Sequence, residues 1–182
     1  MTDTEQHILI RCRDGDRAAF RWVVQNYQRM VFSLALKMLA DEEEAKDAVQ
    51  DVFIRLWQSF ESYDPQRPFA TWLYTIATRL CLDRLRRLRL RPLPQDEAVL
   101  RRFADDADTE RTIENAEWTS IVRMLAAELS EKQHLVFTLC QLEGFSMAEV
   151  EQITGMDLGK VKGNLHAARQ KIRKRLMELG YE

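Results

Sequence analysis

Chain-breaking and cross-linking residues are scarce in this sequence. Its 182 residues include four prolines, six glycines and three cysteines. Because proline and glycine interrupt regular backbone structure, their scarcity favours long helices over many short strands. The cysteines and the three histidines are scattered and form no CxxC pair, at Cys12, Cys81, Cys140, His7, His134 and His166. This spacing argues against a disulfide framework and a zinc ribbon. We therefore predict a protein of a reduced, cytoplasmic compartment that holds no metal and no cofactor.

Long apolar runs and the common catalytic motifs are also missing. No apolar run approaches the roughly 20 residues that span a bilayer, so we expect no membrane insertion. The first ten residues include Asp3 and Glu5 and lack a basic start followed by an apolar stretch, which argues against a signal peptide. The sequence has no glycine-rich phosphate loop, no HExxH and no GxSxG. We therefore predict that the chain is not an enzyme.

The net charge of −2 hides a strong segregation of charge along the chain. Arginines dominate residues 79–91, and lysines and arginines with no acid occupy residues 160–175. The acids gather instead in residues 41–51 and 96–117. Two basic segments separated by acidic ones predict two contacts with a polyanion and at least one contact with a basic partner.

Helical periodicity organises most of the chain. Apolar residues recur at spacings of three and four over residues 16–39, 41–57 and 69–89, and again from residue 113 onwards. No sustained periodicity joins these two groups, and acids dominate the stretch between them. We therefore predict an all-α fold of two small helical domains, residues 1–91 and 113–182, joined by an acidic linker over residues 92–112.

The C-terminal domain carries the pattern of a helix-turn-helix motif. Ser130 and Ser146 each open a capping box, and Asp157 is placed to cap a long final helix that extends to about Leu179. In such a motif the second helix enters the major groove and its flanks contact phosphates. The candidate DNA contacts are Lys160, Lys162, Asn164, His166, Arg169, Lys171 and Arg173. The alternative is a solvated basic helix of a bundle, which could bind an acidic protein.

The N-terminal domain carries a second candidate interface for nucleic acid. Aromatic residues stand beside cations over residues 69–79, a combination that suits unstacked bases. We predict that Phe69 and Trp72 fill the core. The residues that we expect to be exposed are Tyr74, Arg79, Arg86 and Arg87.

The acidic helix of this domain is a candidate docking face for a basic partner. Its residues Asp47, Gln50 and Asp51 lie three and four positions apart, so they share one side of a helix. The alternative is a solvated helix start whose acids only complement the helix dipole.

These segments together resemble the extracytoplasmic-function (ECF) sigma factors of bacterial RNA polymerase. Residues 47–57 resemble the family's polymerase-docking helix, residues 69–87 its promoter-melting helix, and residues 129–176 its C-terminal helix-turn-helix. The resemblance implies that Asp47, Gln50 and Asp51 contact core RNA polymerase. It implies a second set that contacts minus-ten promoter DNA: Ser62, Tyr63, Asp64, Tyr74, Arg79, Arg86 and Arg87. The final helix would then hold the minus-thirty-five duplex.

The resemblance also implies control by a separate anti-sigma factor. Two other classes of protein remain open as alternatives. Glu151, Gly163 and Asn164 differ from the residues that the family usually has in its helix-turn-helix. A sigma-like adaptor that has lost promoter recognition would tolerate such changes. An autonomous helix-turn-helix regulator would bind duplex DNA without polymerase, usually as a dimer.

Overall fold

The computed structural model describes residues 3–90 and 128–178. The regular elements in these two ranges are all helices, and their bounds follow in chain order: α1 (Asp3–Arg13), α2 (Arg17–Leu39), α3 (Glu42–Ser59), the 3-10 helix η1 (Phe60–Ser62), α4 (Phe69–Leu90), α7 (Glu131–Phe137), the π-helix η2 (Thr138–Leu142), α8 (Met147–Thr154) and α9 (Leu158–Glu178). The all-α prediction is confirmed. The linker predicted over residues 92–112 lies outside the described residues, so the domain boundaries stay predictions.

The helices begin where the sequence places capping side chains. Asp16 accepts hydrogen bonds from two backbone N–H groups at the start of α2, and Asp41 accepts one from Glu44 at the start of α3. Ser130 and Ser146 both form complete capping boxes. Each cap satisfies backbone donors that have no partner inside the helix. Helix α1 was not predicted from the sequence.

An aromatic cluster fixes the loop between α3 and α4. Phe60 stacks on Phe69 with ring centroids 6.0 Å apart, and Tyr63 and Trp72 contact both rings. Phe69 is buried as predicted, whereas Trp72 is half-buried at the edge of the core. The cluster therefore joins the end of α3 to the start of α4 and positions residues 61–67 between them.

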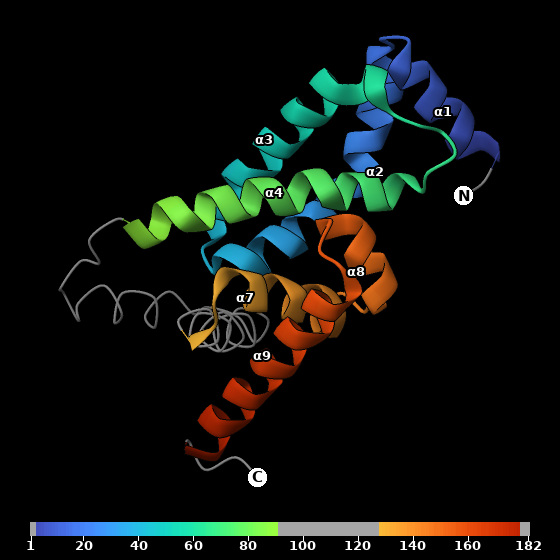
Figure 1. The fold of residues 1–182 in the computed structure, drawn as a ribbon. Coiled ribbons are helices and arrows are strands. Elements are labelled where there is room, and N and C mark those ends of the chain that lie inside the picture. Colours follow the sequence, from blue (N-terminus) through green and yellow to red (C-terminus); the bar gives the residue numbers. More distant parts are fainter. Residues whose placement is uncertain (1–2, 91–127, 179–182) are drawn as a thin grey trace.

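Helix α4 lies between the two groups of helices. It contacts α2 and α3 on one side and α7 and α8 on the other, as Figure 1 shows. Helix α9 packs on α7 and α8 and extends away from α4. The N-terminal and C-terminal helices thus form a closed arrangement with α4 as a shared element.

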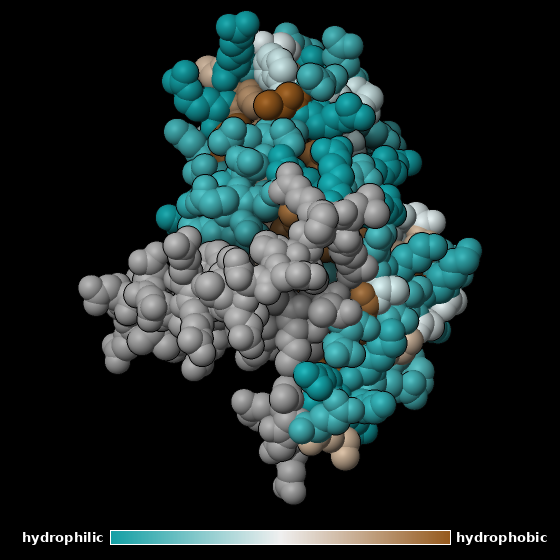
Figure 2. Space-filling model, turned by 90° about the vertical axis from the view of Figure 1, so that its left-hand side faces the viewer, coloured by the Kyte–Doolittle hydropathy of each residue, from teal (hydrophilic) through white to brown (hydrophobic). Residues whose placement is uncertain are grey.

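The described surface is mainly hydrophilic on the face shown in Figure 2. The large hydrophobic residues exposed within the described ranges belong to α1, α3, α8 and α9, and they are Ile10, Ile54, Met147, Leu158 and Met177. No described helix is long and apolar enough to cross a bilayer.

Candidate nucleic-acid and partner interfaces

Helices α8 and α9 form the predicted helix-turn-helix. Gly155 ends α8 with a positive φ of 70°, a conformation that glycine adopts without steric cost. Val150 and Ile153 of α8 are buried together with Val161 and Leu165 of α9. This small apolar seam holds the two helices together, and Ala168, one turn further along the same side of α9, is also buried.

The predicted DNA contacts divide into two flanks of α9. With 3.6 residues per turn, Lys162, His166, Arg169 and Arg173 share one flank, and Lys160, Asn164 and Lys171 share the other. All are exposed except Asn164, which is half-buried and donates a hydrogen bond to the Lys160 carbonyl at 2.8 Å. The sequence analysis grouped these residues as one set of DNA contacts. The buried positions of α9 divide them into two groups on opposite flanks of the helix.

Glycines occupy the exposed ridge between the two flanks. Gly159 and Gly163 lie four residues apart on the side of α9 opposite the buried seam. A Cβ added at Gly163 would meet no heavy atom within 4 Å, so internal packing does not require a glycine there. The ridge leaves the α9 backbone accessible between two rows of polar and cationic side chains.

Glu151 has a local role that its position in the sequence did not suggest. Its Oε1 accepts a hydrogen bond from the Leu158 backbone N–H at 3.0 Å, at the first turn of α9. Asp157 caps the same turn by accepting from the Lys160 N–H at 2.9 Å, and it forms an ion pair with the Lys160 ammonium at 2.7 Å. These hydrogen bonds lower the pKa of the Asp157 carboxyl. The acids therefore stabilise the start of α9.

The loop before α4 presents some of its predicted residues and buries another. Ser62 and Asp64 are exposed, and the Asp64 carboxylate accepts a hydrogen bond from the Gln66 N–H at 2.9 Å. Tyr63 is buried in the aromatic cluster, and its hydroxyl donates to the Arg67 carbonyl at 3.2 Å. The structure thus places Tyr63 as an anchor of the loop, below the surface formed by its neighbours.

The prediction that Tyr74 is exposed is wrong. Tyr74 is 5% exposed, because the C-terminal helices cover this part of α4. The predicted exposure of three arginines of the same helix is confirmed, at Arg79, Arg86 and Arg87. Because α4 packs on two sides, it has a second buried face. The apolar periodicity of the first face alone predicts that residues of the second face are exposed to solvent.

Glu143 is the residue that covers Tyr74, and sequence analysis did not single it out. Its two carboxylate oxygens accept hydrogen bonds from the Lys37 ammonium at 2.6 Å and from the Tyr74 hydroxyl at 2.6 Å. Burial, and then the hydrogen bond to Glu143, raise the pKa of Tyr74 well above its usual range. No local sequence signal marks this residue, because its partners are distant in the chain.

The docking candidates lie on one side of α3. Asp47, Gln50 and Asp51 are exposed, and Ile54 continues the same side one turn later. The Arg84 guanidinium of α4 pairs with Asp51 at 2.5 Å and with Glu44 at 3.0 Å. The charge of Asp51 is therefore partly compensated inside the chain. Helical spacing alone could have identified Ile54, whereas the pairing with Arg84 needed the tertiary structure.

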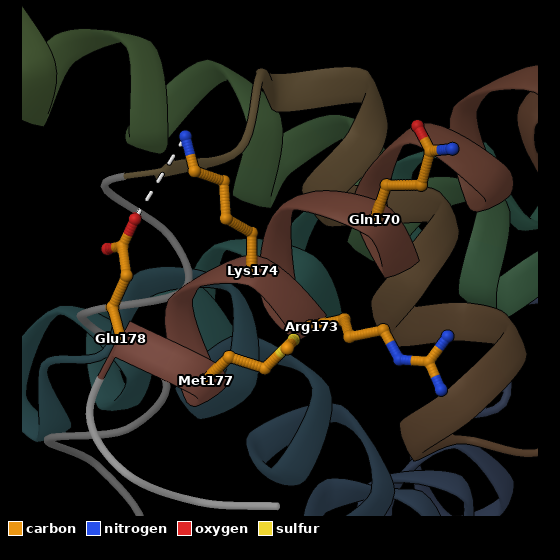
Figure 3. A pocket seen from close by; sticks show the side chains of 5 residues that line it. All are labelled: Gln170, Arg173, Lys174, Met177 and Glu178. Carbon is orange, nitrogen blue, oxygen red and sulfur yellow. Dashed lines mark ion pairs between the residues drawn. The ribbon is translucent and has the colours of Figure 1, made fainter.

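The described residues offer little that resembles an enclosed small-molecule or metal site. Within residues 3–90 and 128–178, no group of three or more potential metal ligands comes together. A shallow depression near the end of α9 is lined by Gln170, Arg173, Lys174, Met177 and Glu178 (Figure 3). All five side chains come from one helix, so no second element closes this depression around a ligand.

Comparisons with known proteins agree with this geometry. The Sigma-70 region 2 family matches residues 23–91, and the Sigma-70 region 4 family matches residues 120–172. The chain is 30% identical over 175 residues to the ECF RNA polymerase sigma factor SigW of Bacillus subtilis, covering 92% of this chain and 94% of the relative. It is also 30% identical to the ECF RNA polymerase sigma-E factor of Haemophilus influenzae, covering 97% of each chain.

Two solved structures share the fold. The first is CnrH in complex with the cytosolic domain of CnrY, with a TM-score of 0.71 at 22% identity, covering 97% of this chain and 99% of that one. The second is the sigma factor RpoE in complex with the anti-sigma factor NepR from Bartonella quintana, with a TM-score of 0.65 at 19% identity, covering 87% and 96%. The matches to the two Sigma-70 families and to the ECF relatives show that the chain belongs to the ECF sigma factors of bacterial RNA polymerase, which direct promoter-specific transcription initiation.

Proposed function

We propose that this sigma factor uses three described surfaces, one to bind core RNA polymerase and two to bind promoter DNA. Helix α3 docks on core RNA polymerase, the loop over residues 61–67 and α4 contact the minus-ten strand, and α9 holds the minus-thirty-five duplex. The observation that carries this proposal is the arrangement of α9, in which two polar and cationic flanks border a ridge of glycines.

The two flanks of α9 suit the two walls of a major groove. A helix that enters the groove meets base edges with its exposed ridge and phosphates with its sides. Lys162, Arg169 and Arg173 on one flank and Lys160 and Lys171 on the other provide positive charge on both sides. Phosphate contacts of this kind supply affinity that falls as salt rises.

Docking on polymerase would depend most on Asp47. This residue is exposed at the centre of the α3 face, between Gln50 and the first turn of the helix. Asp51 contributes less free charge because Arg84 pairs with it at 2.5 Å. The exposed side chain of Ile54 adds an apolar contact on the same face.

The minus-ten surface would combine exposed cations of α4 with the loop that precedes this helix. Arg79 and Arg87 are exposed on α4, and Ser62 and Asp64 are exposed on the loop. Arg86 is also exposed, although it pairs with Asp83 at 3.1 Å and with Glu131 at 2.8 Å. Extruding a base costs a few kcal/mol, which favourable contacts with such cations would offset.

We also propose control by an anti-sigma factor and action in the cytoplasm. The first is supported by the solved structure of RpoE from Bartonella quintana, which contains the anti-sigma factor NepR. The second is supported by the solved structure of CnrH, which contains the cytosolic domain of CnrY. This chain shares its fold with both of these structures.

The test is run-off transcription by core polymerase on a pool of genomic fragments, with and without the protein. We expect new start sites that require the protein and that are lost on Asp47→Lys. The matched control is Asp14→Lys, an equal change of charge at an exposed residue of the turn before α2. Equal loss with both variants would contradict a specific docking role for Asp47.

Run-off transcription together with two binding measurements, to duplex DNA and to core polymerase, distinguishes the two other classes of protein. Specific binding to duplex DNA in the absence of polymerase, with no new start sites, would favour an autonomous regulator. Binding to core polymerase without any new transcript would favour a sigma-like adaptor. Family membership makes both less favoured than a working sigma factor.

A further inference from the structure

A short turn joins the two helices of the helix-turn-helix. Only residues 155–157 separate the end of α8 from the start of α9. The apolar seam between these helices is small, and its buried residues are Val150, Ile153, Val161 and Leu165. Apolar burial is not directional, whereas hydrogen bonds depend steeply on angle. The hydrogen bonds of the turn therefore provide most of the directional restraint on α9.

Glu151 of α8 contacts both ends of this turn. Its carbonyl oxygen accepts a hydrogen bond from the Gly155 N–H at 2.8 Å, and its Oε1 accepts one from the Leu158 N–H at 3.0 Å. The first bond ends α8, and the second engages the first residue of α9. The Leu158 N–H is a donor that has no partner inside its own helix. Glu151 therefore links the last turn of α8 directly to the first turn of α9.

Thr154 restrains the middle of the turn. Its hydroxyl accepts a hydrogen bond from the Met156 N–H at 3.2 Å and donates to the α8 carbonyl one turn earlier at 2.6 Å. Glu151 and Thr154 together supply acceptors for three backbone N–H groups of the connection between the helices. The connection is thus held from α8 at each of these points.

The bond from Glu151 to Leu158 is stronger than an ordinary turn contact. Its acceptor is a carboxylate, and hydrogen bonds to ionised groups are shorter and stronger than neutral ones. The positive end of the α9 dipole adds to the attraction. Glu151 is half-buried, so water competes less for this carboxylate than it does at the exposed Asp157.

We propose that Glu151 is a positioning residue for recognition of the minus-thirty-five element, because its bond to Leu158 fixes the angle at which α9 leaves α8. Hydrogen bonds to base edges weaken steeply when a helix is rotated, whereas cations on long side chains still reach phosphates. Loss of the bond therefore reduces sequence selectivity more than it reduces overall attraction to DNA. This inference rests on the proposed function of α9 in holding the duplex.

Amide hydrogen exchange of the full chain tests the contact itself. We expect Glu151→Ala to speed exchange within residues 156–160 by roughly fivefold, because the Leu158 N–H loses its acceptor. Glu151→Gln retains an acceptor oxygen and should retain most of the protection. Unchanged protection in Glu151→Ala would overturn the proposal, since the bond would then restrain nothing.

Run-off transcription by the sigma–core complex measures the consequence for recognition. Each variant is tested on a promoter recovered with the unmodified protein and on the same promoter with its minus-thirty-five element scrambled. We expect the ratio of the two transcript yields to fall by about fivefold or more in Glu151→Ala, comparable to the loss of one base-pair contact. Glu151→Gln should restore most of the ratio. An equal ratio in Glu151→Ala and in the unmodified chain would overturn the positioning role.

Ser146→Ala is the matched control for stability. It removes the cap at the other end of α8, so it weakens the same helix and leaves the turn intact. Melting temperatures verify that both variants are folded during the assay. If Ser146→Ala lowers the transcript ratio as much as Glu151→Ala does, stability alone explains the loss and the proposal is overturned. If the unmodified chain transcribes both promoters equally, the proposed function of α9 fails, and the positioning role fails with it.

Discussion

The ion pairs of Arg84 predict a specific loss of stability when this residue is changed. Its guanidinium joins α4 to two acids of α3, at 3.0 Å from Glu44 and 2.5 Å from Asp51. The side chain of Arg84 is 16% exposed, against 24% for Glu44 and 48% for Asp51. Arg84→Met retains most of the apolar stem and removes the charge, so it leaves two acids near each other without their cation.

The magnitude follows from this partial burial. Breaking a fully buried pair costs about 3–5 kcal/mol, because the remaining charge has lost its partner. Exposed pairs contribute only about 0.2–1 kcal/mol. Since Arg84 is mostly buried and its partners are partly exposed, we expect Arg84→Met to lower the free energy of unfolding by about 2 kcal/mol.

Urea unfolding of the full chain measures this loss. Arg79→Met is the matched control, because it removes an exposed arginine of the same helix and should change stability by less than about 0.5 kcal/mol. A double-mutant cycle with Asp51→Asn should give a coupling energy of about 1 kcal/mol. If Arg84→Met and Arg79→Met destabilise equally, the ion pairs do not join α3 to α4 energetically and the reasoning is refuted.

Other features of the structure give further predictions. Gly163→Ala should stabilise the chain by about 1 kcal/mol, because alanine is the better helix former and its added methyl group meets no neighbour; a lower melting temperature would contradict this. Ser146→Ala removes the capping box of α8 and should cost about 1 kcal/mol in thermal or urea unfolding, whereas Ser146→Asp, which retains an acceptor, should cost less. The closed chain raises the pKa of Tyr74 above its ordinary value of 10.0, so closure is fully favoured below pH 10 and weakens as pH rises further. The distance between α2 and α9, measured by energy transfer between dyes at the exposed positions Gln28 and Gln170, should therefore increase at alkaline pH. Tyr74→Phe should abolish that dependence, and an equal increase in Tyr74→Phe would assign it to other groups.

Most of the helical fold followed from local sequence patterns. The caps at Asp16, Asp41, Ser130 and Ser146 fix helix starts through hydrogen bonds to residues two or three positions away, so they are visible in the sequence. Helix α1 escaped this reasoning because its apolar stripe is short. Its position depends on burial of Leu9 and Cys12 against the rest of the N-terminal core.

The candidate interfaces were only partly predictable. Exposure of Arg79, Arg86 and Arg87 followed from the amphipathic pattern of α4, but the same pattern gave the wrong result for Tyr74. The spacing of apolar residues in a helix predicts one buried face. Burial of a second face against other helices depends on residues far along the chain. Likewise, the spacing of the α9 cations identified the basic helix, and only the buried seam with α8 divided them into two flanks.

The sequence by itself determined the helices, their caps, the two basic segments and the resemblance to sigma factors, because each depends on neighbours within a few residues. Tertiary structure decided which of these residues remain accessible. Glu143 meets Lys37 and Tyr74 across 106 and 69 positions, and Arg84 meets Glu44 across 40. Such contacts arise from packing of whole helices, and no local pattern specifies them. Burial and pairing of individual charges therefore belong to the folded chain, and they decide which predicted contacts are free to bind a partner.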